Sequence, residues 1–407
     1  MNIAFRSPGE YIQRNGALDR LGEMVLRFGS KAVLAGTEGS LQRYSARILE
    51  QCVPEELEIV PVMIGKETTQ EEIEALAEAF HEAGGQVMIG IGGGKALDTA
   101  RAAADSLSCP LILVPTVASN DAPCSALSII HDENGTVLEL RRTTCNPDAV
   151  LVDTGILMDA PERLLIAGMG DALATWFEAK ACLESGALTL AGAPSSDIAV
   201  RLAQMCYESL LKYGARALMA YRAGIVNDDF ERLVQATIYL SGVGFESGGV
   251  AGAHAINDGF SACQEAAHLY HGEIVGFGTL AMLMLRDTEE ETLKEVTGFM
   301  KTVGLPMTFA ELGIQPEDEL LLRIAHVACT QSVMSNMPFE VTEHDVVRAM
   351  LKADIVGQNV LAEQPQEPQI CRQRRECRWC GCRWSPPCRG NRQARQCRPR
   401  CTGSRKG

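Results

Sequence analysis

The sequence lacks an apolar run of about 20 residues, which is the length that an α-helix needs to cross a bilayer, so we expect no membrane-spanning helix. Its first residues, MNIAFRSPGE, lack the apolar core of a secretory signal peptide. Without either segment, we expect a cytoplasmic protein. Internal repeats are also missing. The length of 407 residues predicts two or three domains around a large buried core.

A pairing pattern is missing from most of the cysteines. Eight of the 15 are scattered between Cys52 and Cys329 without regular spacing, which is typical of a reducing compartment. The other seven crowd into residues 371–401.

The last stretch, residues 365–407, differs from the rest in charge. It holds 11 Arg and 1 Lys against 2 Glu, a net charge of +10, whereas residues 1–364 hold 25 basic and 50 acidic residues, a net charge of −25. So acidic a body repels nucleic acid and anionic lipid, and we expect neither as a partner.

This basic tail has three interpretations. Cys377 and Cys380 have the spacing of zinc ligands, but neither a histidine nor a second CxxC follows at a suitable interval. A basic arm for nucleic acid is a second alternative. We favour an unstructured appendage, because it has almost no aliphatic residues to bury. Its mixture of Arg, Cys, Pro and Trp even resembles translation in a shifted frame.

Predicted strands and helices alternate up to residue 160. Short apolar runs predict strands at 31–36, 58–64, 87–91, 111–114 and 149–153, and residues 69–83 form an amphipathic helical pattern. Two further runs, 125–130 and 136–140, flank Asn134-Gly135, which favours a hairpin. This alternation predicts a parallel sheet with crossover helices.

After Pro161 no convincing strand remains. Helical patterns cover residues 164–182, 198–213, 230–245, 274–285, 289–303, 318–329 and 342–358. The expected fold is an α/β, Rossmann-like, parallel-sheet domain over residues 1–160, then an all-α domain over residues 161–364, then the disordered basic tail over residues 365–407.

A glycine turn follows the strand at 87–91 and leads into a helix near Lys95. Bare backbone N–H groups and the helix dipole favour an anion there, although Lys95 breaks the GxGxxG fingerprint and a plain tight turn is the alternative. Ligands of parallel sheets bind beyond the carboxyl ends of the strands. We therefore expect three segments, 36–37, 92–95 and 115–116, to converge on one crevice.

Three of the few histidines in the helical half fall within eighteen residues: His254, His268 and His271. A lone buried histidine is usually a core residue, but this cluster favours a site. Asp171 begins an apolar helix, where serving the helix dipole is the alternative. One carboxylate and two imidazoles suit Zn²⁺ and leave a fourth position open for substrate. Composition does not choose between His268 and His271.

The loop at residues 115–125, PTVASNDAPCS, is rich in hydroxyl groups and follows a predicted strand. Such hydroxyls can bond the phosphates or the amide of a cofactor, and Asp121 can hold a substrate hydroxyl. The alternative is a capping and turn segment, since Ser, Asn, Asp and Pro are common turn residues.

Over residues 7–364 the sequence resembles the glycerol dehydrogenase branch of the metal-dependent group III, or iron-type, alcohol dehydrogenases. The matching stretches, in this order, are SPGEYIQ, GIGGGKALDTA, PTVASNDAPCSALS, NPDAVLVDT, AGMGDALATWFEA, YLSGVGFESGG and HGE. The resemblance implies Zn²⁺ held by Asp171, His254 and His271, and so prefers His271 over His268. It implies Asp121 beside the substrate diol. The residues implied to bind the nicotinamide cofactor are Thr37, Gly93, Gly94, Lys95, Thr116, Ser119, Ser125, Leu127 and His131.

Three positions bear on the choice of metal and cofactor. Thr175 stands where iron-using relatives carry a further histidine, which favours zinc. The branch that the sequence resembles typically has an aspartate that binds the adenosine ribose where this chain has Thr37, and often a tyrosine in the cofactor hairpin where it has His131. A carboxylate at the ribose rejects a 2′-phosphate, so its loss reopens the choice between NAD and NADP.

The reaction implied is the oxidation of glycerol, or a related vicinal diol, to dihydroxyacetone or the corresponding hydroxyketone with NAD⁺. Zinc lowers the pKa of the alcohol, and the protein holds the C–H bond against the nicotinamide. The alternative is a dehydroquinate synthase-like lyase that uses NAD and zinc, but no basic cluster lies near His254 or His271 in the sequence. A nucleotide-binding scaffold with a structural metal is a third hypothesis. The resemblance also implies a homo-oligomer.

Overall fold

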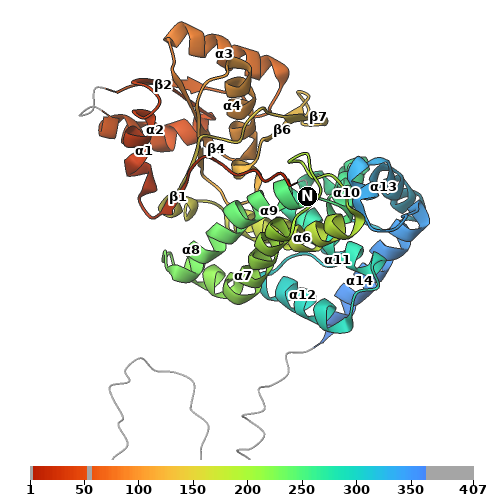
Figure 1. Ribbon diagram of the computed structural model, residues 1–407. Coiled ribbons are helices and arrows are strands. Elements are labelled where there is room, and N and C mark those ends of the chain that lie inside the picture. The colour runs from red at the N-terminus through yellow and green to blue at the C-terminus, as the bar shows by residue number, and fades with distance from the viewer. Residues whose placement is uncertain (1–2, 53–56, 364–407) are drawn as a thin grey trace, which may run out of the picture. The chain divides into compact units, whose positions relative to one another are not determined.

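The computed structural model describes residues 3–52 and 57–363 (Figure 1). The basic tail, with Cys377 and Cys380, lies outside the described residues, so its three interpretations stay predictions.

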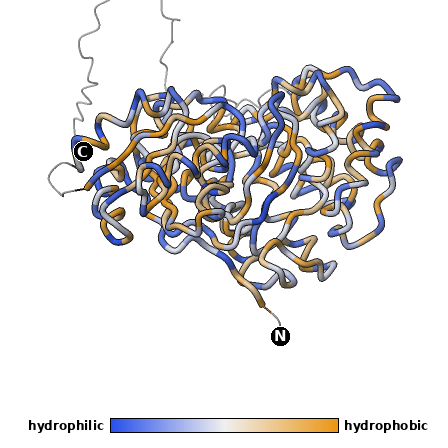
Figure 2. The backbone as a smooth tube through the Cα atoms, turned by 90° about the horizontal axis from the view of Figure 1, so that it is seen from above, coloured by the Kyte–Doolittle hydropathy of each residue, from blue (hydrophilic) through white to orange (hydrophobic). Residues whose placement is uncertain are grey.

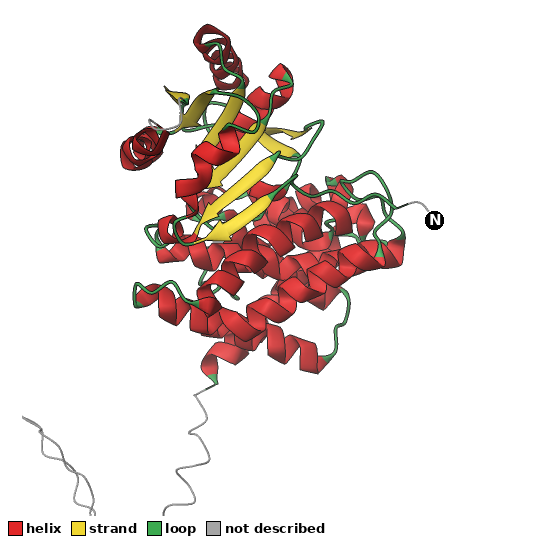
Figure 3. Ribbon diagram, turned by 60° about the vertical axis from the view of Figure 1, so that its left-hand side comes forward, coloured by secondary structure: helices red, strands yellow, loops and turns green. Residues whose placement is uncertain are grey.

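A six-stranded, fully parallel sheet fills the first part of the chain (Figure 3). Its order is β3-β2-β4-β5-β8-β1. The strands are β1 (Tyr11–Arg14), β2 (Lys31–Gly36), β3 (Glu58–Met63), β4 (Val87–Gly92), β5 (Leu111–Pro115) and β8 (Ala149–Asp153). From β2 the chain runs out to the edge at β3 and then returns to the other side of β2, so the direction of winding reverses between β2 and β4. Ligands of such sheets bind at this reversal.

Both faces of the sheet are covered by helices, which explains the nearly continuous apolar runs of its central strands. In β2, Val33 joins a buried cluster with α3 (Gln70–Ala83) and α4 (Gly94–Leu107). Leu34 joins a second cluster on the opposite face, with α1 (Leu21–Val25) and α2 (Glu38–Cys52). Pro61 lies in β3, an edge strand, where a missing N–H group is tolerated.

The predicted hairpin is present as β6 (Leu127–His131) and β7 (Val137–Arg142), which pair antiparallel. Gly135 adopts φ of +83° in its turn, a conformation that glycine tolerates at little cost. The predicted parallel strands are confirmed, whereas β1, α1 and α2 were not predicted.

Helices make up the remainder of the described chain after residue 160 (Figure 1), with no strand among them. They are α6 (Glu162–Ser185), α7 (Asp197–Arg222), α8 (Asp228–Val234), α9 (Ser241–Gly248), α10 (Gly252–Gly259), α11 (His271–Leu285), α12 (Glu290–Val303), α13 (Asp318–Thr330) and α14 (Glu343–Ala362). A short helix α5 (Thr154–Leu157) precedes them. The single helix expected at residues 230–245 is wrong in detail, because a π-helical segment, Gln235–Leu240, separates α8 from α9. The boundary near residue 160 stays a prediction.

Hydrophobic and hydrophilic residues alternate along much of the backbone, as amphipathic helices packed around a shared core require (Figure 2). Within residues 3–52 and 57–363, no helix has both the length and the apolar character to cross a bilayer.

Candidate metal and nucleotide site

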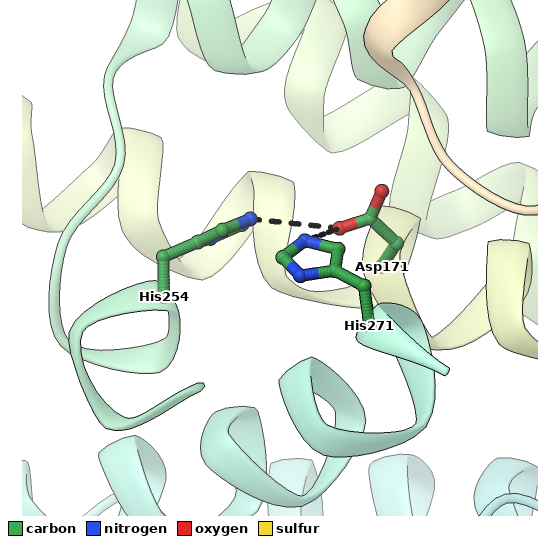
Figure 4. A group of neighbouring side chains, drawn as sticks. All are labelled: Asp171, His254 and His271. Carbon is green, nitrogen blue, oxygen red and sulfur yellow. Dashed lines mark ion pairs between the residues drawn. The ribbon is translucent and has the colours of Figure 1, made fainter. Parts of the chain in front are cut away.

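Asp171, His254 and His271 meet in the helical part of the chain (Figure 4). Oδ1 of Asp171 lies 3.5 Å from Nε2 of His254 and 3.4 Å from Nε2 of His271. The three potential ligand atoms all lie within 4.8 Å of one another. Asp171 is buried, His254 is half-buried and His271 is exposed, so the cluster is open on the side of His271.

Glycines allow the helices that carry these ligands to approach one another. A Cβ on Gly272 of α11 would lie 1.8 Å from the carbonyl oxygen of Ala167 in α6. A Cβ on Gly170 would lie 2.1 Å from the carbonyl oxygen of Gly272. The motifs AGMGDA and HGE therefore pack α6 and α11 backbone to backbone. This contact brings Asp171 to His271.

Glu178 orients the second imidazole. Its Oε2 accepts a hydrogen bond from Nδ1 of His254 at 2.6 Å, and its Oε1 accepts the backbone N–H groups of Ala251 and His254. A proton held on Nδ1 leaves Nε2 as the free electron pair, which faces Asp171. A carboxylate behind a histidine is the usual support of a histidine ligand to a metal.

A bidentate ion pair fixes the helix start that carries His271. Both carboxylate oxygens of Glu273 contact Arg163, at 2.6 and 2.7 Å. Glu273 also accepts the backbone N–H of Tyr270, which closes the first turn of α11. His268 lies before this helix, exposed, with Nδ1 bonded to the carbonyl oxygen of Glu265, and is not part of the cluster.

The loop that carries Asp121 reaches the same cluster from the sheet. The backbone N–H of Asp121 donates to Oδ2 of Asp171 at 3.1 Å, and its own Oδ2 accepts the hydroxyl of Ser241 at 2.7 Å. A Cβ on Gly168 would lie 2.0 Å from the carbonyl oxygen of Ala118, so α6 presses directly on this loop. Asp121 is buried. The sequence predicts this residue beside the substrate but gives no sign of its burial.

The neighbouring carboxylates favour positive charge at the imidazole of His254. Burial lowers the pKa of His254, but the carboxylates of Glu178 and Asp171 outweigh burial and raise this pKa well above its ordinary value. Burial works to raise the pKa of Asp171, but the two imidazoles hold it below its usual range. Burial and the neighbouring charge of Asp171 raise the pKa of Asp121.

The glycine turn ends β4, at the reversal of the sheet. Gly92 has φ of +151°, and a Cβ there would lie 2.7 Å from Cβ of Ala96. A Cβ on Gly94 would meet the side chain of Asn120 at 3.0 Å. The ammonium group of Lys95 forms an ion pair with Glu67, so part of its charge is already compensated.

Thr37 and Thr116, which follow β2 and β5, line a cavity of about 220 Å³. This cavity lies where the sequence predicts a crevice beyond the strand ends. Gly93 caps the start of α4 and packs near Val117, which also lines the cavity.

The other predicted cofactor residues follow along the loop and the hairpin. Ser119 is half-buried. Ser125 is fully buried, and its hydroxyl donates to the carbonyl oxygen of Ala122 at 3.0 Å. Leu127 begins β6, and its carbonyl oxygen accepts a hydrogen bond from Arg101. His131 is buried, and its Nδ1 has no hydrogen-bond partner among the described residues.

Known proteins that are similar to this chain over most of its length include several dehydrogenases. Residues 8–154 match the family model described as iron-containing alcohol dehydrogenase. The chain is 42% identical to the glycerol dehydrogenase of Citrobacter freundii over 359 residues, which covers 88% of this chain and 98% of that one. It is 42% identical to the glycerol dehydrogenase of Thermotoga maritima, over 86% of this chain and 96% of the relative. The chain belongs to the iron-containing alcohol dehydrogenase family.

A solved structure of a member of the family, glycerol dehydrogenase from Schizosaccharomyces pombe, superimposes with a TM-score of 0.85 at 32% identity, covering 88% of this chain and 92% of that chain. The probable glycerol dehydrogenase of Sinorhizobium meliloti gives a TM-score of 0.83 at 35% identity, over 88% and 100%. The α/β part followed by helices is thus the fold of this family.

The residues present fit the metal that the family implies. Oδ1 of Asp171 is buried and has no hydrogen-bond partner among the described residues. A buried carboxylate oxygen without a partner is costly, and a cation between it and the two Nε2 atoms would compensate it. The hydroxyl of Thr175 lies 2.7 Å from the hydroxyl of Ser241, and the two form a hydrogen bond.

Two supporting residues were missed from the sequence, Glu178 and Glu273. Glu178 lies seven residues after Asp171 in α6, and a spacing of two helical turns places both side chains on one face. That spacing was an available signal. Glu273 lies in the motif HGE, but the sequence gives no sign of its role because its partner Arg163 lies 110 residues earlier in the chain.

Proposed function

We propose that this protein is a zinc-dependent, NAD-linked dehydrogenase that oxidises glycerol and related vicinal diols to hydroxyketones. One observation carries the proposal: Oδ1 of Asp171 lies without a hydrogen-bond partner between two imidazole Nε2 atoms. The names of the relatives, glycerol dehydrogenases at 42% identity over most of both chains, support the substrate.

In this proposal Asp171, His254 and His271 hold the metal, and the exposed side of His271 is where substrate enters. A divalent cation bound there supplies Lewis-acid chemistry, which favours loss of the alcohol proton near neutral pH. Zinc is favoured over iron because the donor set is one carboxylate and two imidazoles, and Thr175 offers no further imidazole.

Asp121 binds a hydroxyl of the diol in this proposal. Its backbone is tied to Asp171 and its carboxylate to Ser241, so the position of the carboxylate relative to the metal ligands is fixed. Two adjacent hydroxyls, one at the metal and one at Asp121, would orient the C–H bond toward the nicotinamide. Such positioning is how a protein contributes to hydride transfer.

The dinucleotide lies across the carboxyl ends of β2, β4 and β5 in this proposal. The turn at Gly93 and Gly94 holds the diphosphate, because bare N–H groups begin α4 there. Thr37 and Thr116 lie toward the adenosine, and Lys95 and His131 lie on the hairpin side. The roles of Ser119, Ser125 and Leu127 stay predictions, and the buried hydroxyl of Ser125 is already used by Ala122.

The lyase alternative is disfavoured by the relatives, which are named as dehydrogenases. The two reactions differ in what happens to the cofactor. A dehydrogenase accumulates one NADH for each diol oxidised, whereas the lyase returns its NAD⁺ at each turnover.

The test is a panel of glycerol, 1,2-propanediol and 1,3-propanediol with NAD⁺, before and after removal of metal by a chelator. We expect NADH to accumulate with the two vicinal diols, activity to be lost with the metal, and Zn²⁺ to restore it better than Fe²⁺. Full turnover of the metal-free protein, or turnover without net NADH, would reject the proposal. The cytoplasmic location and the homo-oligomer are part of the proposal too, and light scattering after gel filtration tests the latter.

A further inference from the structure

The cavity of about 220 Å³ lies beyond the carboxyl ends of β2 and β5. Its polar lining comes from three segments of the chain. The polar side chains are Thr37, Ser40, Arg43, Tyr44, Thr116 and Asp159. The first four lie after β2 or in the first two turns of α2, so the start of α2 forms one wall of the cavity.

The sheet topology places this cavity beside the glycine turn. β2 pairs with β4 in parallel, with Gly36 opposite Ile91, so the residue after β2 lies next to that turn. The winding of the sheet reverses between these two strands, and doubly wound sheets bind dinucleotides at such a reversal. At the adenosine ribose of a dinucleotide, an acidic residue accepts the 2′-hydroxyl and selects NAD, whereas a nearby arginine accommodates the 2′-phosphate of NADP.

Here the residue after β2 is Thr37, a neutral hydroxyl, whose Oγ1 lies 3.3 Å from Oγ of Ser40. Unlike a carboxylate, the neutral hydroxyl of a threonine does not repel a phosphate. Two hydroxyls at hydrogen-bonding distance can both turn toward one anionic group.

Arg43 supplies the positive charge on the same wall. Its exposed guanidinium forms no ion pair with any carboxylate of the described residues. Arg47, one turn further along α2, is different, because it contacts Asp19 at 2.7 Å and Asp153 at 3.4 Å. Of these two arginines, only Arg43 lines the cavity, and its side chain hydrogen-bonds the Tyr44 hydroxyl rather than a carboxylate.

Two acidic side chains lie near Arg43, and neither forms an ion pair with it among the described residues. Glu38 accepts a hydrogen bond from Gln42 and does not line the cavity. Asp159 does line it, and lies on the side of Tyr44: burial raises the pKa of Tyr44 and the carboxylate of Asp159 raises it further, while Arg43 lowers it. Asp159 thus faces the phenol and lies outside ion-pair distance of Arg43.

We propose that Arg43, with Thr37 and Ser40, forms a binding site for the adenosine 2′-phosphate, so that the enzyme accepts NADP(H) as well as NAD(H). The inference rests on the proposed function in one respect, the placement of adenosine beyond β2. Charge-assisted bonds from a guanidinium to a phosphate are the strongest contacts such a site makes. Arg43 therefore determines cofactor specificity, and Thr37 permits it.

The test uses the full-length protein and two adenosine fragments, neither of which reaches the metal cluster. Titration calorimetry compares adenosine 2′,5′-bisphosphate with adenosine 5′-monophosphate. We expect the bisphosphate to bind about tenfold more tightly, in line with one charge-assisted contact, and the preference to shrink at high salt. Equal affinities for the two fragments in the wild-type protein would overturn the proposal.

Three variants separate the site from general electrostatics. Arg43→Gln is expected to remove most of the preference for the bisphosphate, and Thr37→Asp to reverse it. Arg201→Gln, on the exposed face of α7, removes the same charge away from the cavity and should leave the preference intact. Thermal melting of each variant checks the fold. A preference unchanged in Arg43→Gln, or lost equally in Arg201→Gln, would contradict the assignment.

Turnover distinguishes this inference from the proposed function. If the wild-type protein prefers the bisphosphate fragment but does not oxidise glycerol, only the proposed function is rejected. Glycerol oxidation with NAD⁺ but no fragment preference would reject only the 2′-phosphate site. If both hold, the ratio of kcat/KM for NADP⁺ to that for NAD⁺ should fall about tenfold in Arg43→Gln.

Discussion

Glu178 holds His254 at two points, the ring Nδ1 at 2.6 Å and the backbone N–H at 2.9 Å. A single carboxylate therefore sets the tautomer, the ring orientation and the backbone position of one ligand. The side chain is fully buried, so no water competes for these bonds. Nε2 then faces Oδ1 of Asp171, at 3.5 Å.

Glu178→Gln is expected to weaken metal binding. The glutamine oxygen can still accept the two backbone N–H groups, but its NH₂ group would face Nδ1 and drive the imidazole proton onto Nε2, where the metal should bind. Loss of such a support costs about 10–100-fold in metal affinity. Competition with a chromophoric chelator measures the affinity. Wild-type zinc affinity in this variant would show that Glu178 is only a structural residue.

His271→Ala and His268→Ala form a matched pair, because the two histidines lie three residues apart and only His271 is in the cluster. We expect His271→Ala to lose bound zinc and activity together, since two of three protein ligands do not retain the ion. His268→Ala should keep both. Elemental analysis of the purified variants, beside diol turnover, gives the answer. Full turnover of a metal-free His271→Ala protein would refute the metal site.

Gly272→Ala should destabilise the fold, because the new Cβ would lie 1.8 Å from the carbonyl oxygen of Ala167. Overpacking of a buried contact costs about 1–3 kcal/mol, and more where backbone cannot move. Gly298→Ala is the control, since its Cβ would meet nothing within 4 Å in α12 and should stabilise the helix by about 1 kcal/mol. Urea unfolding of the two variants should therefore shift in opposite directions.

Glu246→Gln should alter how stability depends on pH. Burial raises the pKa of Glu246 above its ordinary value, although the N–H of Ala126, the Asn146 amide, Arg6 and Arg101 oppose the rise. From about pH 4.3, the ordinary pKa of glutamate, up to the raised native pKa, the folded state binds more protons than the unfolded state, so the free energy of unfolding falls as pH rises. The glutamine variant lacks this loss.

The measurement for Glu246 is the difference between the two proteins, because other groups titrate in both. Urea unfolding at about pH 5 and about pH 7 should show a steeper decline for the wild type. An equal decline in the two proteins would mean that ionisation of Glu246 does not destabilise the folded state.

Buried periodicity predicted much of the fold. The central strands are apolar on both faces and short, and each was placed within two residues of its observed ends. Strand β1 escaped prediction because its four residues, YIQR, are half polar and gain their strand conformation from pairing with β8. Helix α10 escaped because Gly252, Gly259 and the polar residues between them favour turns locally.

The sequence predicts the residues of the ligand cluster but not their geometry. Asp171 and the two histidines stand out by residue type, yet the choice of His271 over His268 came from family resemblance alone. The physical reason for that choice is the backbone contact at Gly272, a tertiary feature that spacing along the chain does not encode. Local pattern likewise gives no sign that Arg43 lines the cavity beside Thr37.

The π-helical segment Gln235–Leu240 determines the direction of the Ser241 side chain. One residue added to a helical turn advances the following side chains by about 100° around the axis. That rotation directs the hydroxyl of Ser241 at Asp121 while Phe230 and Leu233, before the insertion, keep their places in the core. Deleting one residue of the segment would reset the phase of α9 and turn the hydroxyl of Ser241 away from the carboxylate of Asp121.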